Sequence, residues 1–355
     1  MNPDKEFWRG RNVLITGHTG FKGGWLAHWL QLMGARVTGY SIEPPTVPNL
    51  FEESKLYQIV NSVHGDVRDL FNLKKVISNT HPEVIFHLAV QPLVRYSYDH
   101  PIETYETNVM GTVNLLEAAR GVSSVRAVVC ITTDKCYENK EWVWGYREND
   151  PMGGHDPYSS SKGCSELAIS AYRRSFFSSD NRAGIASVRA GNVIGGGDWG
   201  QDRLIPDIIK AFGEKKEVVI RNPKAIRPWQ HVLEPLCGYL LLAERICSSG
   251  ASYTDAWNFG PNDSDAQTVE WIVNKMVRLW GEEAKWTNDK AAHPHEARYL
   301  KLDISKAKTV LGYSPRLEIE TTLEWVVNWY KKRKQGADVA LLTQRQIKEF
   351  EKIIT

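Results

Sequence analysis

Short apolar runs alternate with amphipathic stretches through the first half of the chain. Residues 25–33 have helical periodicity, because Trp25, Leu26, Trp29, Leu30 and Met33 fall on one side. The apolar runs are predicted strands, at residues 11–16, 35–40, 83–88, 125–132 and 185–189. Such regular alternation of strands and helices predicts an α/β fold with a doubly wound parallel (Rossmann) sheet.

The pattern changes after residue 189, where loops lengthen and charged and aromatic residues mix. A smaller C-terminal substrate-binding domain is therefore expected. We predict a dinucleotide-binding domain at 1–189, to which 231–260 returns through an apolar helix (231–246) and a strand (255–259). The substrate-binding domain takes 190–230 and 261–333, with amphipathic helices at 268–280 and 321–332. The charged tail, 334–355, is at most a docked helix.

Composition narrows the class of protein. The 355 residues are 42% hydrophobic with a formal charge of +2, so neither nucleic acid nor a membrane is an expected partner. No apolar run approaches the roughly 18 residues of a membrane span. The first residues are polar and acidic, unlike a signal peptide. Five cysteines, an odd number without metal-ligand spacing, favour a reduced cytoplasmic protein without a metal site.

A glycine turn follows the first predicted strand and precedes the first long helix. Gly17 permits a tight turn, Gly20 lets the backbone approach a pyrophosphate, and Gly23 lets the helix and strand pack closely. Strand, turn and helix together form the context of a dinucleotide site. The candidate cofactor contacts here are Gly17, His18, Thr19, Gly20, Phe21, Lys22 and Gly23.

A tyrosine and a lysine occupy one face of a predicted helix. Tyr158 and Lys162 are four residues apart, which places them one turn from each other. A nearby ammonium favours the phenolate and lowers the pKa of the tyrosine toward working pH. Such a tyrosine can take a proton from a sugar hydroxyl while hydride leaves the same carbon.

The glycine turn, the segment Thr132-Thr133-Asp134-Lys135 and the Tyr158–Lys162 pair occur in an order that resembles the extended short-chain dehydrogenase/reductase family. The resemblance implies a bound NAD. It places Asp66 and Val67 at the adenine, and Lys162 at the nicotinamide ribose. The family loop over the pyrophosphate and nicotinamide corresponds to Ala89, Val90 and Gln91, with Val90 where a second alanine is usual. Asn108 corresponds to an asparagine that orders the active-site backbone.

The cofactor itself is predicted as NAD rather than NADP. Glu43 lies about twenty residues past the glycines, where an acidic residue holds the adenosine ribose. Glu43 stands three residues after the second predicted strand, so a position in the following loop, away from the ribose, stays open as an alternative. No arginine that would bind a 2′-phosphate immediately follows Tyr40.

Further motifs resemble the nucleotide-sugar 4,6-dehydratases of that family, among them Gly196-Gly197-Asp198-Trp199 and Arg227-Pro228-Trp229-Gln230-His231. A diphosphate is well bound by arginine forks. The candidate substrate contacts are Asn192, Arg203, Arg227 and Arg298. The resemblance also implies a homodimer, joined through the helices at 107–120 and 158–177, and a role in making deoxysugars for lipopolysaccharide.

The implied reaction is oxidation, elimination and reduction in one site. Tyr158 takes the proton of the sugar 4-hydroxyl, and Thr133 hydrogen-bonds the C4 oxygen. The C4 ketone then makes the C5 proton removable. Asp134 is the expected acid for the departing 6-hydroxyl, and Lys135 is the expected base at C5, where related dehydratases carry glutamate. Lys135 requires burial or a neighbouring cation that depresses its pKa.

Two alternatives remain open from the sequence. A nucleotide-sugar 4-epimerase or reductase would need Thr133, Tyr158 and Lys162 but not Asp134 and Lys135. A non-enzymatic dinucleotide-sensing protein could keep the fold, but it would be expected to lose Tyr158 or Lys162.

Overall fold

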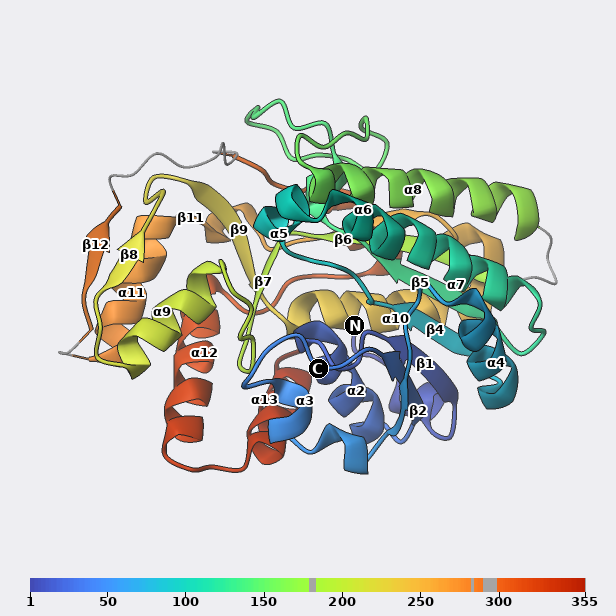
Figure 1. Ribbon diagram of the computed structural model, residues 1–355, viewed down its shortest axis with the longest axis horizontal. Coiled ribbons are helices and arrows are strands. Elements are labelled where there is room, and N and C mark those ends of the chain that lie inside the picture. The colour runs from blue at the N-terminus through green and yellow to red at the C-terminus, as the bar shows by residue number, and fades with distance from the viewer. Residues whose placement is uncertain (179–182, 282–283, 290–298, 355) are drawn as a thin grey trace.

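The computed structural model describes residues 1–178, 183–281, 284–289 and 299–354. Within these residues a seven-stranded parallel sheet has the order β10-β6-β5-β4-β1-β2-β3 (Figure 1). This confirms the predicted doubly wound fold. The order reverses between β1 and β4, which creates a crevice at the carboxyl ends of the strands. The strands are β1 (Asn12–Thr16), β2 (Arg36–Ser41), β3 (Asn61–His64), β4 (Val84–His87), β5 (Ala127–Ile131), β6 (Gly184–Ala190) and β10 (Ala256–Phe259).

Helices cover both faces of the sheet because successive strand residues point to opposite sides. In β1, Val13 and Ile15 join one hydrophobic core, whereas Leu14 joins the other. One face carries α4 (Leu70–Thr80), α7 (Gly111–Arg120) and α8 (Pro157–Phe176), and the other carries α2 (Phe21–Leu32) and α10 (Leu233–Ser249) (Figure 1). Within the described ranges, no helix combines the length and apolar character needed to cross a bilayer.

The helix α2 is buried on nearly all sides. Its residues Trp25 and Trp29 have no exposed surface. The C-terminal helix α13 (Val339–Ile354) packs on α2, and Trp29 Nε1 donates to Glu351 Oε1 at 2.9 Å. The charged tail therefore forms a helix that packs on α2 and α3 (Leu50–Glu53).

A smaller group of elements extends from one end of the sheet (Figure 1). One sheet has the order β11-β9-β7, and β12 pairs with β8. The helix expected from residue 231 begins instead at Leu233, because His231 ends strand β9. These elements are β7 (Asn192–Ile194), α9 (Leu204–Gly213), β8 (Val218–Ile220), β9 (Ile226–His231), β11 (Ala266–Thr268), α11 (Val269–Trp280), β12 (Trp286–Asn288) and α12 (Ile319–Lys334).

The helix expected at 107–120 is interrupted. It consists of α6 (Pro101–Tyr105), the π-helical turn η2 (Glu106–Met110) and α7. Single π-turns are frequent at functional sites, and this one contains Asn108. The other short helices near the cavity are α3 (Leu50–Glu53) and α5 (Val94–Asp99), while α1 (Lys5–Trp8) starts the chain.

Candidate active site

A cavity of about 1210 Å³ lies over the carboxyl ends of the sheet strands. Gly17 and Tyr158 line it from the side of the large sheet. Asn192 and Arg227 line it from β7 and β9. The volume exceeds what one small ligand needs, so two ligands can lie in it together.

The glycine turn is packed too tightly for side chains. Gly17 has φ +80°, and a Cβ there would meet Ala89 N at 2.7 Å. A Cβ at Gly23 would lie 2.2 Å from Gly17 O. Gly20 is the N-cap of α2 and has no side chain to cap it, so the first helical N–H groups face the cavity. This arrangement fits an anion such as a pyrophosphate.

His18 points away from this cavity. Its Nε2 lies 2.8 Å from Ser62 Oγ, and its ring packs against Gly39. Burial lowers the pKa of His18 to about 4, which keeps the ring neutral. The other six residues of the glycine segment line the cavity, namely Gly17, Thr19, Gly20, Phe21, Lys22 and Gly23.

The expected adenine and ribose contacts also line the cavity. Glu43 is 84% exposed in its side chain and pairs with His64 Nδ1 at 3.3 Å. The Asp66 carboxylate accepts from Arg68 N at 2.8 Å and from its guanidinium at 2.9 and 2.6 Å. Arg68, which was not among the predicted contacts although it stands only two residues further along the chain, holds the carboxylate of Asp66 in place. Val67 also lines the cavity.

The loop that contains Ala89, Val90 and Gln91 lies along the same wall, so Val90 faces the cavity. Asn108 lies behind this loop, buried and outside the lining. Its Oδ1 accepts from Gln91 N at 2.9 Å, and its Nδ2 donates to Ser161 Oγ at 2.8 Å. Asn108 therefore joins the loop to α8.

The helix α8 starts where its first turn can place a tyrosine in the cavity. Asp156 is the N-cap and accepts from Ser159 N at 2.9 Å, and Pro157 occupies the first helical position. Tyr158 and Lys162 are both buried. The Lys162 ammonium donates to Ile131 O at 3.1 Å, which ties α8 to the end of β5.

The electrostatics of this pair differ from the expectation. Burial raises the pKa of Tyr158 to about 12, while a hydrogen bond with Thr133 acts in the opposite direction. Burial lowers the pKa of Lys162 to about 8, and the charge of Glu166 opposes that change. The phenol is thus protonated at neutral pH, because desolvation outweighs the effect of nearby charge.

The residues after β5 divide between the interior and the rim. Asp134 is buried, accepts from Thr133 Oγ1 at 2.9 Å, and has a pKa raised by burial. A raised pKa is what a proton donor needs. Lys135 lines the cavity but its side chain is exposed, so the expected burial of this lysine is not present. Lys22 does meet that condition: burial and then the charges of Lys162 and Arg203 lower its pKa to about 8.

The described substrate candidates lie on the opposite wall. Arg203 pairs with Asp198, with Nη1 at 3.0 Å from both carboxylate oxygens. Arg227 donates to Ile226 O at 3.0 Å, and Asn192 lines the cavity at the start of β7. Arg298 lies outside the described residues.

Two further arginines line the cavity and were missed in the sequence. Arg95 and Arg221 lie 3.5 and 3.4 Å from Asp202 Oδ1. Arg221 directly follows an apolar strand, a signal that could have identified it, whereas Arg95 belongs to no motif. Among the residues with described positions, no group of three or more His, Cys, Asp or Glu side chains could hold a metal ion.

Comparison with known proteins places these features in a family. A model of the GDP-mannose 4,6-dehydratase family matches residues 14–326. The chain is 57% identical over 351 residues to the CDP-glucose 4,6-dehydratase of Salmonella typhimurium strain LT2, covering 98% of each chain.

Solved structures show the same fold at low identity. A dTDP-glucose 4,6-dehydratase from Bacillus anthracis in complex with NAD has a TM-score of 0.74 at 22% identity, over 92% of this chain and 98% of the other. A UDP-glucose 4-epimerase from Thermotoga maritima with UDP-glucose has 0.77 at 21%, over 91% and 99%. The expected membership of the extended short-chain dehydrogenase/reductases is confirmed, and the chain belongs to the GDP-mannose 4,6-dehydratase family.

Proposed function

We propose that the protein converts CDP-glucose to CDP-4-keto-6-deoxyglucose with NAD as a cofactor that is regenerated in each turnover. The observation that carries the proposal is the 57% identity to a CDP-glucose 4,6-dehydratase across 98% of both chains. The site adds independent chemical support, because Tyr158 and Lys162 line the same cavity as Asp134 and Lys135.

The chain has the groups that would hold NAD. The close-packed glycine turn and the start of α2 suit the pyrophosphate, and Asp66 with Val67 suits the adenine. Lys162 would hold the nicotinamide ribose. When bound, NAD would accept hydride from C4 of the sugar and later return it to C6.

The oxidation depends on three residues of the chain. Tyr158 would take the proton from the 4-hydroxyl, and Thr133, which already hydrogen-bonds Tyr158, would hold the C4 oxygen. Since burial keeps Tyr158 protonated, the phenolate must be favoured by the Lys162 ammonium, one helical turn away. Lys162 is charged only below its pKa of about 8.

The elimination would use the turn that follows Thr133. Asp134 would donate its proton to the departing 6-hydroxyl, since its pKa is raised by burial. Lys135, at the rim, would remove the C5 proton, which the C4 ketone makes acidic. Because its side chain is exposed, this role requires that bound substrate and NAD bury the amine and favour its neutral form.

Lys135 would return a proton to C5 when hydride reaches C6. Tyr158 gains the O4 proton and Asp134 loses one to the departing water, so the proton on Tyr158 must pass to Asp134, through Thr133, which contacts both. That transfer restores all three residues.

A panel of nucleotide-sugars tests this function. The purified protein is incubated with NAD and CDP-, dTDP-, GDP- or UDP-glucose, and the products are analysed by mass spectrometry. We expect loss of one water from CDP-glucose in preference to the others. An epimerase would leave the mass unchanged, and a dinucleotide sensor would leave all four substrates intact.

The setting of the reaction is proposed on the same grounds. All five cysteines are free thiols, which suits a reducing cytoplasm, and the product would enter the synthesis of deoxysugars for lipopolysaccharide. Exposed apolar side chains on η2 and α8, within the helices at 107–120 and 158–177, suit a homodimer, with Met110 at 50% and Leu167 at 61% exposed. The division into 1–189 with 231–260 and 190–230 with 261–333 also stays a prediction.

A further inference from the structure

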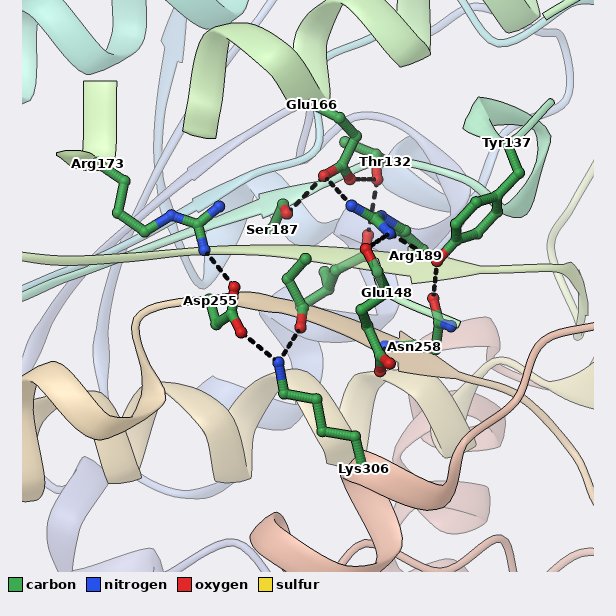
Figure 2. A network of polar contacts seen from close by, with 12 residues as sticks. Thr132, Tyr137, Glu148, Glu166, Arg173, Ser187, Arg189, Asp255, Asn258 and Lys306 are labelled. Carbon is green, nitrogen blue, oxygen red and sulfur yellow. Dashed lines mark hydrogen bonds and ion pairs between the residues drawn. The ribbon is translucent and has the colours of Figure 1, made fainter. Parts of the chain in front are cut away.

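A buried ion pair joins α8 to β6 outside the cavity lining (Figure 2). Arg189 Nη2 lies 2.7 Å from Glu166 Oε2, and the two side chains are 4% and 2% exposed. Burial raises the pKa of Glu166, but the charge of Arg189 and hydrogen bonds from Arg189, Thr132 and Ser187 lower it further than burial raises it. The pair is therefore ionised inside the protein, where a charge without a partner would be costly.

Each member of the ion pair holds one end of the segment that carries Thr133, Asp134 and Lys135. Thr132, which directly precedes Thr133, donates its hydroxyl proton to Glu166 Oε1. Tyr137, which directly follows the turn η3 (Asp134–Cys136), accepts from Arg189 Nη1 at 2.6 Å. Figure 2 shows Thr132 beside the Glu166 carboxylate and Tyr137 beside the Arg189 guanidinium. The segment between them carries every proposed acid–base residue except Tyr158.

The remaining contacts anchor the pair to the surrounding structure. Ser187 of β6 donates to Glu166 Oε2 at 2.7 Å. Arg189 Nη1 also donates to Glu148 O at 2.9 Å, and Tyr137 Oη donates to Asn258 Oδ1 at 2.8 Å. The anchor thus reaches β6, β10 and the loop after the turn, so the pair is fixed by three parts of the chain.

We propose that the Glu166–Arg189 ion pair is a positioning device for the reaction, which fixes Thr133, Asp134 and Lys135 relative to Tyr158 and Lys162. Glu166 lies one helical turn after Lys162 on α8. The helix that carries Tyr158 and Lys162 therefore also holds the turn that carries Asp134 and Lys135. The proposal rests on the proposed function. Glu166 and Arg189 are positioning residues, since neither lines the cavity.

The negative charge of Glu166 has a second effect on the same site. It raises the pKa of Lys162 against the lowering caused by burial. The other titratable groups that interact with Lys162 are Cys130 on β5, Cys136 in η3, His87 on β4 and Lys22 on α2. Burial lowers the pKa of His87 to about 3 and raises the pKa of both thiols, which leaves Glu166 as the anion among these neighbours.

A matched set of substitutions tests the positioning role. Thr132→Val and Tyr137→Phe each remove a hydroxyl that joins the turn to the ion pair, and Ser187→Ala removes a hydroxyl that joins the pair to β6 alone. A small misplacement of reacting groups costs up to about 10²-fold in rate. We expect Thr132→Val and Tyr137→Phe to lower kcat by about 10-fold or more while KM for CDP-glucose and NAD affinity change by less than about 2-fold. Ser187→Ala should keep kcat within about 2-fold.

A pH profile provides a readout that general loss of stability would not change. Glu166→Gln keeps the shape of the side chain but removes its charge, so the alkaline limb of kcat should move to lower pH. Glu83→Gln is the control, because Glu83 pairs with Arg11 away from the cavity. The positioning role is wrong if Thr132→Val and Tyr137→Phe keep wild-type kcat, or if Ser187→Ala lowers kcat as much as they do. A wild-type protein without activity on CDP-glucose contradicts the proposed function as well.

Discussion

The ammonium of Lys162 lies 3.1 Å from the carbonyl oxygen of Ile131, the last residue of β5. This contact places a buried charge between the helix of Tyr158 and the strand that leads to Thr133. The pKa of Lys162 falls from 10.5 to about 8 because burial disfavours its charged form. The site is therefore built at a cost to stability, as active sites with perturbed pKa values commonly are.

Lys162→Met should stabilise the cofactor-free protein at pH 7 while it abolishes oxidation of the sugar. Charging the buried amine destabilises the folded protein by on the order of 3 kcal/mol relative to the unfolded chain, and the substitution removes this cost. Loss of the hydrogen bond to Ile131 offsets about 1 kcal/mol of the gain in stability. Between pH 8 and 10.5 the unfolded chain binds more protons than the folded one, so wild-type stability rises with pH in this window. In denaturation experiments, the difference in free energy of unfolding between variant and wild type should be smaller at pH 10 than at pH 7. A variant less stable than wild type at pH 7 contradicts this account.

Lys135→Ala should separate oxidation from elimination. Tyr158 can still accept the 4-hydroxyl proton, so NADH absorbance should accumulate while water loss falls by about 10²-fold or more. Tyr158→Phe should instead block the first step and give no NADH. Both are followed by absorbance and mass spectrometry in the same reaction.

The control for this prediction is Lys140→Ala, which removes an exposed lysine outside the cavity lining. Near-normal dehydration by Lys135→Ala would show that another group removes the C5 proton. Lys22 would then be tested next, because its pKa is lowered to about 8 by burial and by the cations Lys162 and Arg203.

Gly23→Ala should weaken NAD binding without unfolding the protein. The added Cβ would meet Gly17 O at 2.2 Å, so the turn must shift away from the phosphate position. Overpacking of this kind costs about 1–3 kcal/mol, which corresponds to a loss of about 5- to 150-fold in NAD affinity, measured by calorimetry. Gly121→Ala, where no atom lies within 4 Å of the added Cβ, is the matched control. Equal NAD affinity in both variants would show that the pyrophosphate does not bind at this turn.

Leu167→Asp should convert the expected dimer to a monomer. Leu167 is 61% exposed on α8, one of the two helices of the expected interface, and burying an unpaired carboxylate in an interface is costly. Val310→Asp changes an apolar side chain that is 52% exposed in another part of the surface, and it should leave the mass unchanged. Light scattering at micromolar concentration gives the mass. A wild-type monomer under these conditions refutes the dimer.

The sequence predicted the sheet because its strands are apolar and regularly spaced, and burial within a doubly wound sheet requires that pattern. It placed the start of the helix after β9 two residues early, at 231 instead of Leu233, because an apolar run alone does not distinguish the end of a strand from the start of a helix. The π-turn at Glu106–Met110 left no mark in the periodicity. Local sequence reasoning cannot detect such a distortion, which depends on packing against other helices.

Candidate site residues were found in the sequence where they belong to motifs, and missed where only the fold brings them together. Arg95 and Arg221 reach the cavity from separate segments. The pKa values were also beyond sequence reasoning. The Tyr158–Lys162 spacing predicted a lowered tyrosine pKa, but the depth of burial, which the spacing does not contain, raises it to about 12.

The fate of the C4 hydrogen tests the closed reaction cycle most directly. CDP-glucose that carries deuterium at C4 and carbon-13 throughout the glucose ring is mixed with unlabelled CDP-glucose in water, and the products are analysed by mass spectrometry and NMR. If Thr133, Asp134, Lys135 and Tyr158 carry out all three steps in one cavity, deuterium will appear at C6 of the molecules that began with it. In a parallel reaction of unlabelled CDP-glucose in D2O, deuterium will appear at C5. Deuterium lost to water, or found at C6 of molecules that began unlabelled, would contradict the mechanism.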